Sequence, residues 1–108
     1  MASKYNMDLD QGADFRIDFT LSDVDGVVPD FSDYDSRSQM RKHYSSNSFI
    51  SFIVNAYSNG VISLTLDSAA SANISPGRYF YDVEVISSSN VVTRVVEGII
   101  NVTPNITR

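Results

Sequence analysis

Apolar and polar residues alternate with a period of two along most of this chain, and that pattern constrains the fold more than any other feature. The clearest run places apolar side chains at every second position, at Phe15, Ile17, Phe19 and Leu21. Successive side chains of a β-strand point to opposite faces of the sheet. The run therefore predicts a strand with one face against a core and the other in water.

Similar strand-like runs recur at residues 5–9, 34–43, 48–57, 61–66, 79–85 and 91–102. Asn59-Gly60 separates two of them, and this dipeptide favours the tight turn of a hairpin spanning residues 48–66. Asp67 opens an alanine-containing segment, residues 67–74, that suits one capped helical turn between strands. The chain therefore predicts an all-β fold: an antiparallel β-sandwich of about seven strands with one short helical crossover.

Length and composition exclude several classes of protein. At 108 residues the chain suits a single β-sandwich domain, with residues 101–108 as a C-terminal tail. It contains no cysteine, which excludes disulfides and thiolate chemistry. It has no 18-residue apolar run, and its first residues lack the apolar core of a secretory signal. We therefore expect no membrane partner, and the pI near 4.5 argues against nucleic acid.

The net charge of −5 is unevenly distributed along the chain. Residues 1–35 contain nine Asp but only Lys4 and Arg16 as bases, whereas residues 36–108 contain four acids and six bases. One interpretation is that these charges are simply solvated. The other is head-to-tail attraction between subunits, because opposite potentials guide association.

Few residues offer catalytic or metal-binding chemistry. His43 is the single histidine, and it has no evident partner in the sequence for a triad or a metal centre. Asp23-Val24-Asp25-Gly26 resembles part of a calcium loop but departs from the full EF-hand pattern. A looser cation site that includes Asp30, Asp33 and Asp35 stays open beside the simpler reading as a turn. We expect no catalytic residues, no cofactor and no metal.

Opposite charges recur on two of the predicted strands. Arg37 and Arg41 share one face of the 34–43 strand, and Asp82 and Glu84 share one face of the 79–85 strand. If the two strands are neighbours, these side chains oppose each other across the sheet. The pairs are then either ordinary surface ion pairs or part of an interface, and the two interpretations are compatible.

The last predicted strand has apolar side chains on both faces. Val95 and Ile99 lie on one face, and Val96, Ile100 and Val102 lie on the other. A strand that is apolar on both faces is either enclosed between two layers or covered by a partner. Because a sandwich of this size has two layers, Val95 and Ile99 join Arg37, Arg41, Asp82 and Glu84 as interface candidates.

Six short motifs follow one another in an order that resembles a known family. They lie at residues 10–15 (DQGADF), 34–41 (YDSRSQMR), 60–66 (GVISLTL), 75–85 (SPGRYFYDVEV), 92–98 (VTRVVEG) and 102–108 (VTPNITR). This order is similar to that of small virion structural proteins of tailed bacteriophages. It also resembles the amino-terminal domains of some phage upper-baseplate proteins. The likeness covers nearly the whole chain, although no single motif is decisive.

The resemblance implies an immunoglobulin-like sandwich, located in the virion and without enzymatic activity. It would assemble with other virion proteins, as a homo-oligomer, in the tail, baseplate, neck or capsid decoration. In the upper-baseplate relatives the domain precedes a longer receptor-binding chain, whereas this sequence stops at Arg108. The alternative function is a small carbohydrate-binding sandwich for host adhesion, with Tyr44, Tyr57 and Tyr79 stacking on sugar rings.

Overall fold

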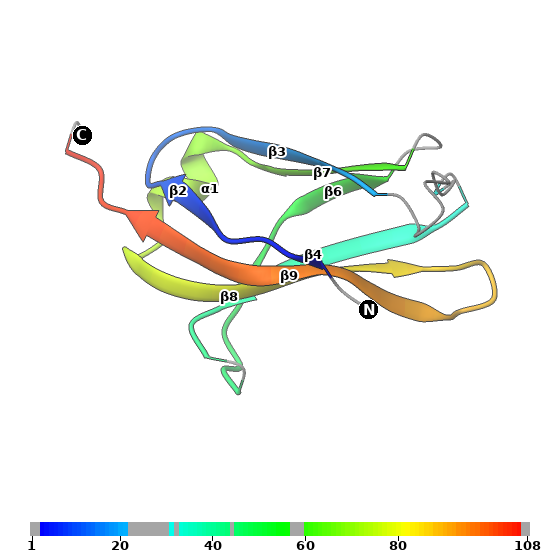
Figure 1. Cartoon of the computed structure of the whole chain (residues 1–108). Helices are drawn as coiled ribbons and strands as arrows, with labels where there is room; N and C mark the ends of the chain where they lie inside the picture. Colours follow the sequence, from blue (N-terminus) through cyan, green and yellow to red (C-terminus); the bar gives the residue numbers. More distant parts are fainter. Residues whose placement is uncertain (1–2, 22–30, 32, 44, 57–59, 107–108) are drawn as a thin grey trace.

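The chain forms two β-sheets packed face to face, as the computed structural model shows (Figure 1). The structure describes residues 3–21, 31, 33–43, 45–56 and 60–106, which extend over 44 × 27 × 22 Å. The larger sheet contains β1 (Ser3–Lys4), β2 (Met7–Asp10), β4 (Asp35–Arg41), β5 (Ile50–Ser51), β8 (Gly77–Ile86) and β9 (Val92–Thr103). The smaller sheet contains β3 (Phe15–Thr20), β6 (Ile53–Ala56) and β7 (Val61–Leu66). The predicted all-β sandwich is confirmed.

The long hairpin of β8 and β9 forms the centre of the larger sheet. The strand order is β1-β9-β8-β4-β5, and β2 also pairs with β9. A tight turn joins the two strands: the amide of Asn90 donates to the carbonyl of Ser87, and Asn90 has a positive φ of 66°. Asparagine tolerates this left-handed conformation better than most residues.

The N-terminal edge of the larger sheet corrects the prediction of a purely antiparallel fold. β1 and β2 both run parallel to β9, with Ser3 opposite Val96 and Met7 opposite Ile100. The predicted tail is also too long, because residues 101–103 belong to β9 and pair with β2. Local alternation carries no information on the direction of a distant partner, so the sequence could not reveal this pairing.

Gly98 allows the N-terminal segment to cross β9 closely. Between β1 and β2 the backbone passes over this glycine, and a Cβ there would collide with the Tyr5 carbonyl oxygen. The amide of Tyr5 donates to the carbonyl of Glu97, and the side chain of Asn6 accepts from the amide of Ile99 at 3.0 Å. The glycine inside this strand therefore marks a close backbone approach, as glycines in strand interiors often do.

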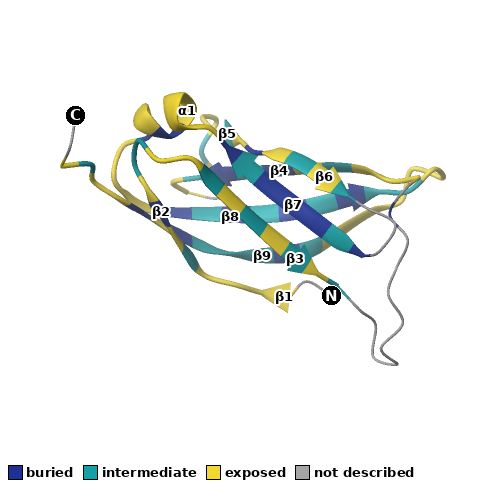
Figure 2. Cartoon of the chain, turned by 90° about the horizontal axis from the view of Figure 1, so that it is seen from above, coloured by how far each residue is buried: buried dark blue, intermediate teal, exposed yellow. Residues whose placement is uncertain are grey.

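The smaller sheet places β7 between β3 and β6, both antiparallel to it. β7 is mostly buried, as Figure 2 shows, with Ile62, Leu64 and Leu66 directed into the core. The pairing of β6 with β7 confirms the predicted hairpin. Its turn at residues 57–59 lies outside the described residues, and Gly60 beside it has a positive φ of 76°.

The predicted strand at residues 48–57 is divided between the two sheets. β5 pairs with β4 in the larger sheet, and β6 pairs with β7 in the smaller one. Between them Phe52 is buried and its amide donates to the carbonyl of Ser38 at 3.0 Å. The chain thus changes sheets at Phe52 and closes one side of the sandwich.

The helical crossover is confirmed as α1 (Ser68–Ala72), which connects β7 to β8. Its N-cap is Asp67, whose side chain accepts from the amide of Ala70 at 2.8 Å. Ser71 is the buried residue of the helix and donates to the carbonyl of Ala13 at 2.7 Å, which ties the helix to the segment before β3. None of the described helical structure is long and apolar enough to span a membrane.

We predict that Gly98→Val will destabilise the fold by about 1–3 kcal/mol, as overpacking typically does. The added side chain would push the Tyr5 backbone away from β9 and break the hydrogen bonds that join Tyr5 and Asn6 to β9. Urea unfolding measures the change. The control is Val92→Ala at the exposed end of the same strand, which should change stability by less than about 0.5 kcal/mol. Equal stability of Gly98→Val and wild type would show that the N-terminal crossing contributes little.

Candidate charged groove

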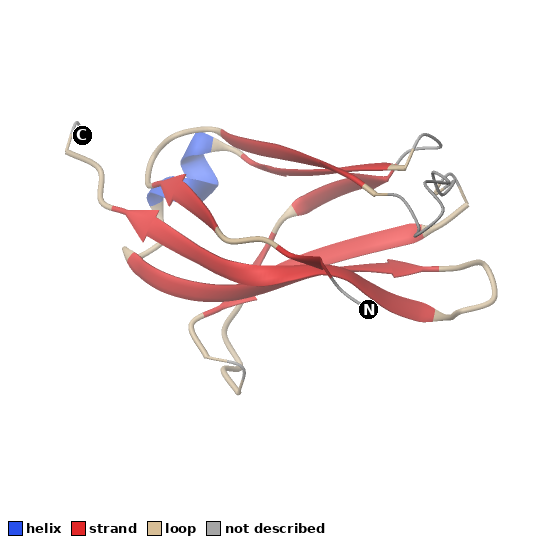
Figure 3. Cartoon of the chain, in the orientation of Figure 1, coloured by secondary structure: helices blue, strands red, loops and turns tan. Residues whose placement is uncertain are grey.

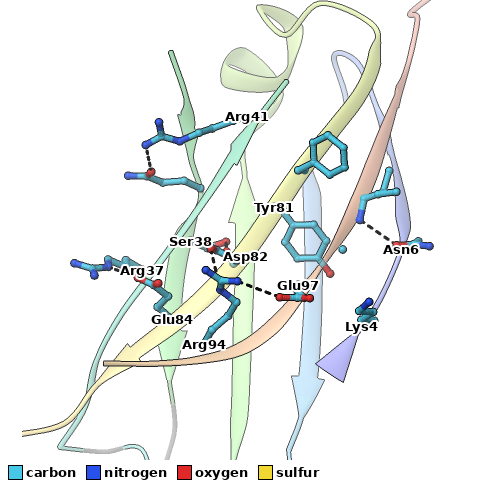
Figure 4. Close-up of a pocket in the computed structure, with 14 residues that line it drawn as sticks. Lys4, Asn6, Arg37, Ser38, Arg41, Tyr81, Asp82, Glu84, Arg94 and Glu97 are labelled. Atoms are coloured by element: carbon cyan, nitrogen blue, oxygen red, sulfur yellow. Dashed lines mark hydrogen bonds and ion pairs between the residues drawn. The ribbon is translucent and has the colours of Figure 1, made fainter. Parts of the chain in front are cut away.

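A groove of about 640 Å³ lies on the outer face of the larger sheet (Figure 4). The charged residues that line it are Lys4, Arg37, Arg41, Asp82, Glu84, Arg94 and Glu97. Its other lining residues include Asn6, Gln39, Phe80 and Ile99. We refer to this surface as the charged groove. It contains four cationic and three anionic side chains on four neighbouring strands, so it carries charges of both signs.

The alternation of β8 places these charges on one face. Tyr79, Tyr81, Val83 and Val85 point into the core, so Phe80, Asp82 and Glu84 point outward between them. β4 is the antiparallel neighbour of β8, with Arg37 opposite Glu84 and Arg41 opposite Phe80. The prediction that these two strands are neighbours with opposing charges is therefore confirmed.

The groove contains one clear cross-strand ion pair. Arg37 Nε lies 2.7 Å from Glu84 Oε1, and the arginine side chain is 58% exposed. A pair of this kind contributes roughly 0–1 kcal/mol to stability, because water competes for both charges. The pair is thus well formed but is not a major source of stability.

Arg41 has no carboxylate partner among the described residues. Its guanidinium donates to the carbonyl of Ser46 and to the side-chain oxygen of Gln39, and it lies 5.0 Å from the centre of the Phe49 ring. These contacts hold the connection between β4 and β5, which projects away from the sandwich in Figure 3. The positive charge of Arg41 therefore stands at one end of the charged groove without an opposing anion.

Asp82 lies in the middle of the charged groove and is poorly compensated. Its carboxylate is 3.3 Å from Arg94 Nε, but Arg94 is shared with Glu97 at 3.2 Å. Burial raises the pKa of Asp82 above its usual 3.8, and the nearby Glu84 raises it further, whereas Arg94 lowers it. Partial burial and a neighbouring like charge both disfavour the ionised carboxylate. Perturbed groups of this kind concentrate at functional sites.

The structure separates Val95 from Ile99, which the sequence placed on one face. A β-bulge shifts the register so that Val83 faces Val96 but Glu84 faces Arg94, leaving Val95 unmatched. Val95 therefore packs against the core, whereas Ile99 lines the charged groove. The expectation that both lie on an outward apolar face is wrong for Val95, because the bulge reverses the alternation that predicted it.

Sequence reasoning missed several residues of the charged groove. Lys4 belongs to β1 and lies opposite Glu97 of β9, and Arg94 reaches the groove only because of the bulge. Asn6 arrives through the crossing over Gly98. The alternation of Val91–Val102 was visible in the sequence, but the bulge and the parallel N-terminal strand have no local signal.

Three further candidates from the sequence gain no support as ligand sites. His43 is exposed in the connection after β4. No group of three or more His, Asp or Glu side chains suited to a metal occurs in the described part of the chain, and Asp23, Asp25 and Asp30 lie outside that part. The expected sugar-stacking role of Tyr79 is wrong, because its ring is buried and its hydroxyl donates to the Ser75 carbonyl. Tyr44 and Tyr57 also lie outside the described residues.

A second polar cluster covers the outer face of the smaller sheet. Ser63 on β7 is buried there and donates to Asp18 Oδ1 at 2.7 Å, and Arg16 Nε donates to the same oxygen at 3.2 Å. The hydrogen bond from Ser63, followed by that from Arg16, lowers the pKa of Asp18 below its usual value. Ser63 lies directly opposite Asp18 in the sheet. The cluster provides a hydrogen-bond partner for the hydroxyl of Ser63, which is buried although it lies on the outer face of the sheet.

Comparison with known proteins identifies no family. No protein-family model matches the chain, and no curated protein sequence matches it. Among solved structures, the Listeria monocytogenes internalin-like protein lmo2027 is similar, with a TM-score of 0.47 and 14% sequence identity over 96% of this chain. This chain spans 28% of the length of that protein. A likeness at this level carries no argument about function.

We predict that replacing Asp82 with Asn will remove a pH-dependent loss of stability. Because the pKa of Asp82 is raised on folding, the protonated form stabilises the fold below the unfolded pKa, and this contribution is lost as pH rises through the folded pKa. The stability of Asp82→Asn minus that of wild type should therefore increase with pH from about 4 and then level off. Urea unfolding from pH 3.5 to 7.5 measures this difference. A difference that stays constant would contradict the raised pKa.

We predict the opposite pH dependence for Asp18→Asn. Because the pKa of Asp18 is lowered on folding, its carboxylate stabilises the fold above the unfolded pKa, and this contribution is lost as pH falls through the folded pKa. The advantage of wild type over Asp18→Asn should shrink as pH falls below about 4. The same unfolding series, extended to pH 2, tests this. Asp33→Asn is the control for a general effect of removing one exposed Asp.

Proposed function

We propose that the chain is a non-enzymatic structural protein that acts by assembling with other proteins, as a component of a tailed-phage virion. The observation that carries the proposal is the charged groove. A sheet face that is only exposed to solvent does not require a groove, yet the groove on this face contains four cations and three anions around Phe80 and Ile99. Arginine and partly buried apolar side chains are typical of protein interfaces. The phage assignment rests on the order of the six sequence motifs.

The charges favour contact with a protein partner over simple exposure to solvent. Asp82 is held with a raised pKa between Glu84 and a shared Arg94, which is an unfavourable arrangement in the free chain. A partner that brings a further positive charge would relieve it. Because interfaces with complementary charges gain specificity more than affinity, the groove suits selection of the correct neighbour in an assembly.

The backbone offers a second means of assembly. β3 and β6 are the edges of the smaller sheet, and Ile53 on β6 is 62% exposed. Unpaired strand edges are a hazard for a monomer but a means of docking in an assembly. At the tip of the β8–β9 hairpin, Val91 and Val92 are also exposed. These features support an assembly role without requiring a catalytic site.

Two measurements test the proposal. Light scattering after size exclusion should give a discrete oligomer, a multiple of the 11.9 kDa chain mass. Quantitative mass spectrometry of virus particles purified from the source culture should find the chain in a fixed ratio to the major virion proteins. A clean monomer would contradict self-assembly and leave an adaptor or decoration role. Absence from purified particles would contradict the virion role, and specific binding on a glycan array would favour the carbohydrate-binding alternative.

A further inference from the structure

The charged groove has a defined order of charges across the sheet. Arg41 stands on β4 at one end, and Lys4 stands on β1 at the other, with Asp82 and Glu97 on the strands between them. Within the described residues, Lys4 and Arg41 form no ion pair. Along the diagonal through these four residues the pattern is positive, negative, positive, and Arg94 and the Arg37–Glu84 pair lie beside this diagonal. Three strand spacings separate β4 from β1. Arg41 also lies two residues further along the sheet than Lys4, so the two backbone positions are roughly 16 Å apart.

The outer face of β3 presents the reverse pattern. Asp14 immediately precedes the strand, Arg16 and Asp18 lie within it, and all three are exposed. The side chains of Arg16 and Asp18 are 63% and 47% exposed. Read along the strand, the pattern is negative, positive, negative. Asp14 and Asp18 are four residues apart, which is roughly 13 Å in an extended strand.

We propose that β3 of one copy docks into the charged groove of a second copy of this chain. Asp14 and Asp18 would approach the two unpaired cations, Arg41 and Lys4, and the intervening Arg16 would approach Asp82. The roughly 13 Å between the anions lies within side-chain reach of the roughly 16 Å between the cations. Arg16 would add a positive charge beside Asp82, whose present partner Arg94 is shared with Glu97. This inference rests on the proposed assembly function and specifies the contact through which copies of the chain associate.

The geometry of this contact determines the form of the assembly. β3 lies at an edge of the smaller sheet, whereas the charged groove lies on the outer face of the larger sheet. The two surfaces are different, so the interface is heterologous, and each copy can donate β3 to one neighbour and accept β3 from another. Such contacts produce a ring if the rotation closes and an open filament if it does not.

Two variants separate the two sides of the contact. In the groove variant, Lys4→Glu and Arg41→Glu reverse both unpaired cations; Lys4→Glu alone serves as a second form, because Arg41 also holds the connection to Ser46. In the β3 variant, Asp14→Asn and Asp18→Asn remove both anions but retain oxygen acceptors for their hydrogen bonds. The matched controls are Lys42→Gln and Asp33→Asn, which lie outside both surfaces. Circular dichroism confirms that each variant is folded.

Sedimentation velocity over a range of concentrations measures association in 50 mM and 500 mM NaCl. Wild type and both controls should associate, and the high salt should weaken association because it screens the charges. Each variant should raise the dissociation constant at least about tenfold. An equimolar mixture of the two variants should form a 1:1 dimer and nothing larger, because one copy retains an intact β3 and the other an intact groove.

Three results would overturn the inference: a wild-type chain that stays monomeric throughout, variants that associate as wild type does, or folded variants whose mixture forms no dimer. These results are distinguishable from failure of the proposed function. If the chain is present in purified virus particles but shows any of the three, the virion role stands and this contact is wrong. If it is absent from particles but associates as described, the contact stands and the virion role is wrong.

Discussion

The pairing of β8 with β9 is the interaction on which the rest of the structure depends. β8 buries Tyr79, Tyr81, Val83 and Val85 on one side, and this row is the contribution of β8 to the hydrophobic core. The same backbone must then direct Phe80, Asp82 and Glu84 to the opposite side, where they form the centre of the charged groove. The groove is therefore built on the same strand as the core, so a shift in the register of β8 would move both.

Much of the fold could be predicted from local pattern. Alternation located β3, β4, β7 and β8, Asn59-Gly60 located the hairpin of β6 and β7, and Asp67 with the following alanines located α1. The opposition of Arg37 and Glu84 was also predictable, because it requires only that the two strands are neighbours and that side chains alternate between the faces of each strand. Each of these features is encoded within about ten consecutive residues or follows from simple neighbourhood.

The features that escaped prediction depend on distant contacts. The bulge at Val95 changes the face that the preceding residues of β9 occupy, and no local sequence pattern marks it. The sheet change at Phe52 depends on where β4 and β7 lie. The groove as a whole combines residues from four strands, two of which meet only through the parallel pairing of β1 with β9. Lys4 could not be assigned to it without that pairing, and Arg94 could not be assigned to it without the bulge.

The parallel pairing of the first and last strands has a consequence for the synthesis of the chain. Met7 and Leu9 cannot pair with Ile100 and Val102 until those residues, more than ninety positions later in the chain, have been synthesised. Until then the N-terminal strand has no partner in its own chain, and its apolar side chains are exposed. Contacts between residues so distant in sequence slow folding, because a long loop must close before any gain. The pairing of β1 and β2 with β9 can thus form only after the segment up to Thr103 has left the ribosome.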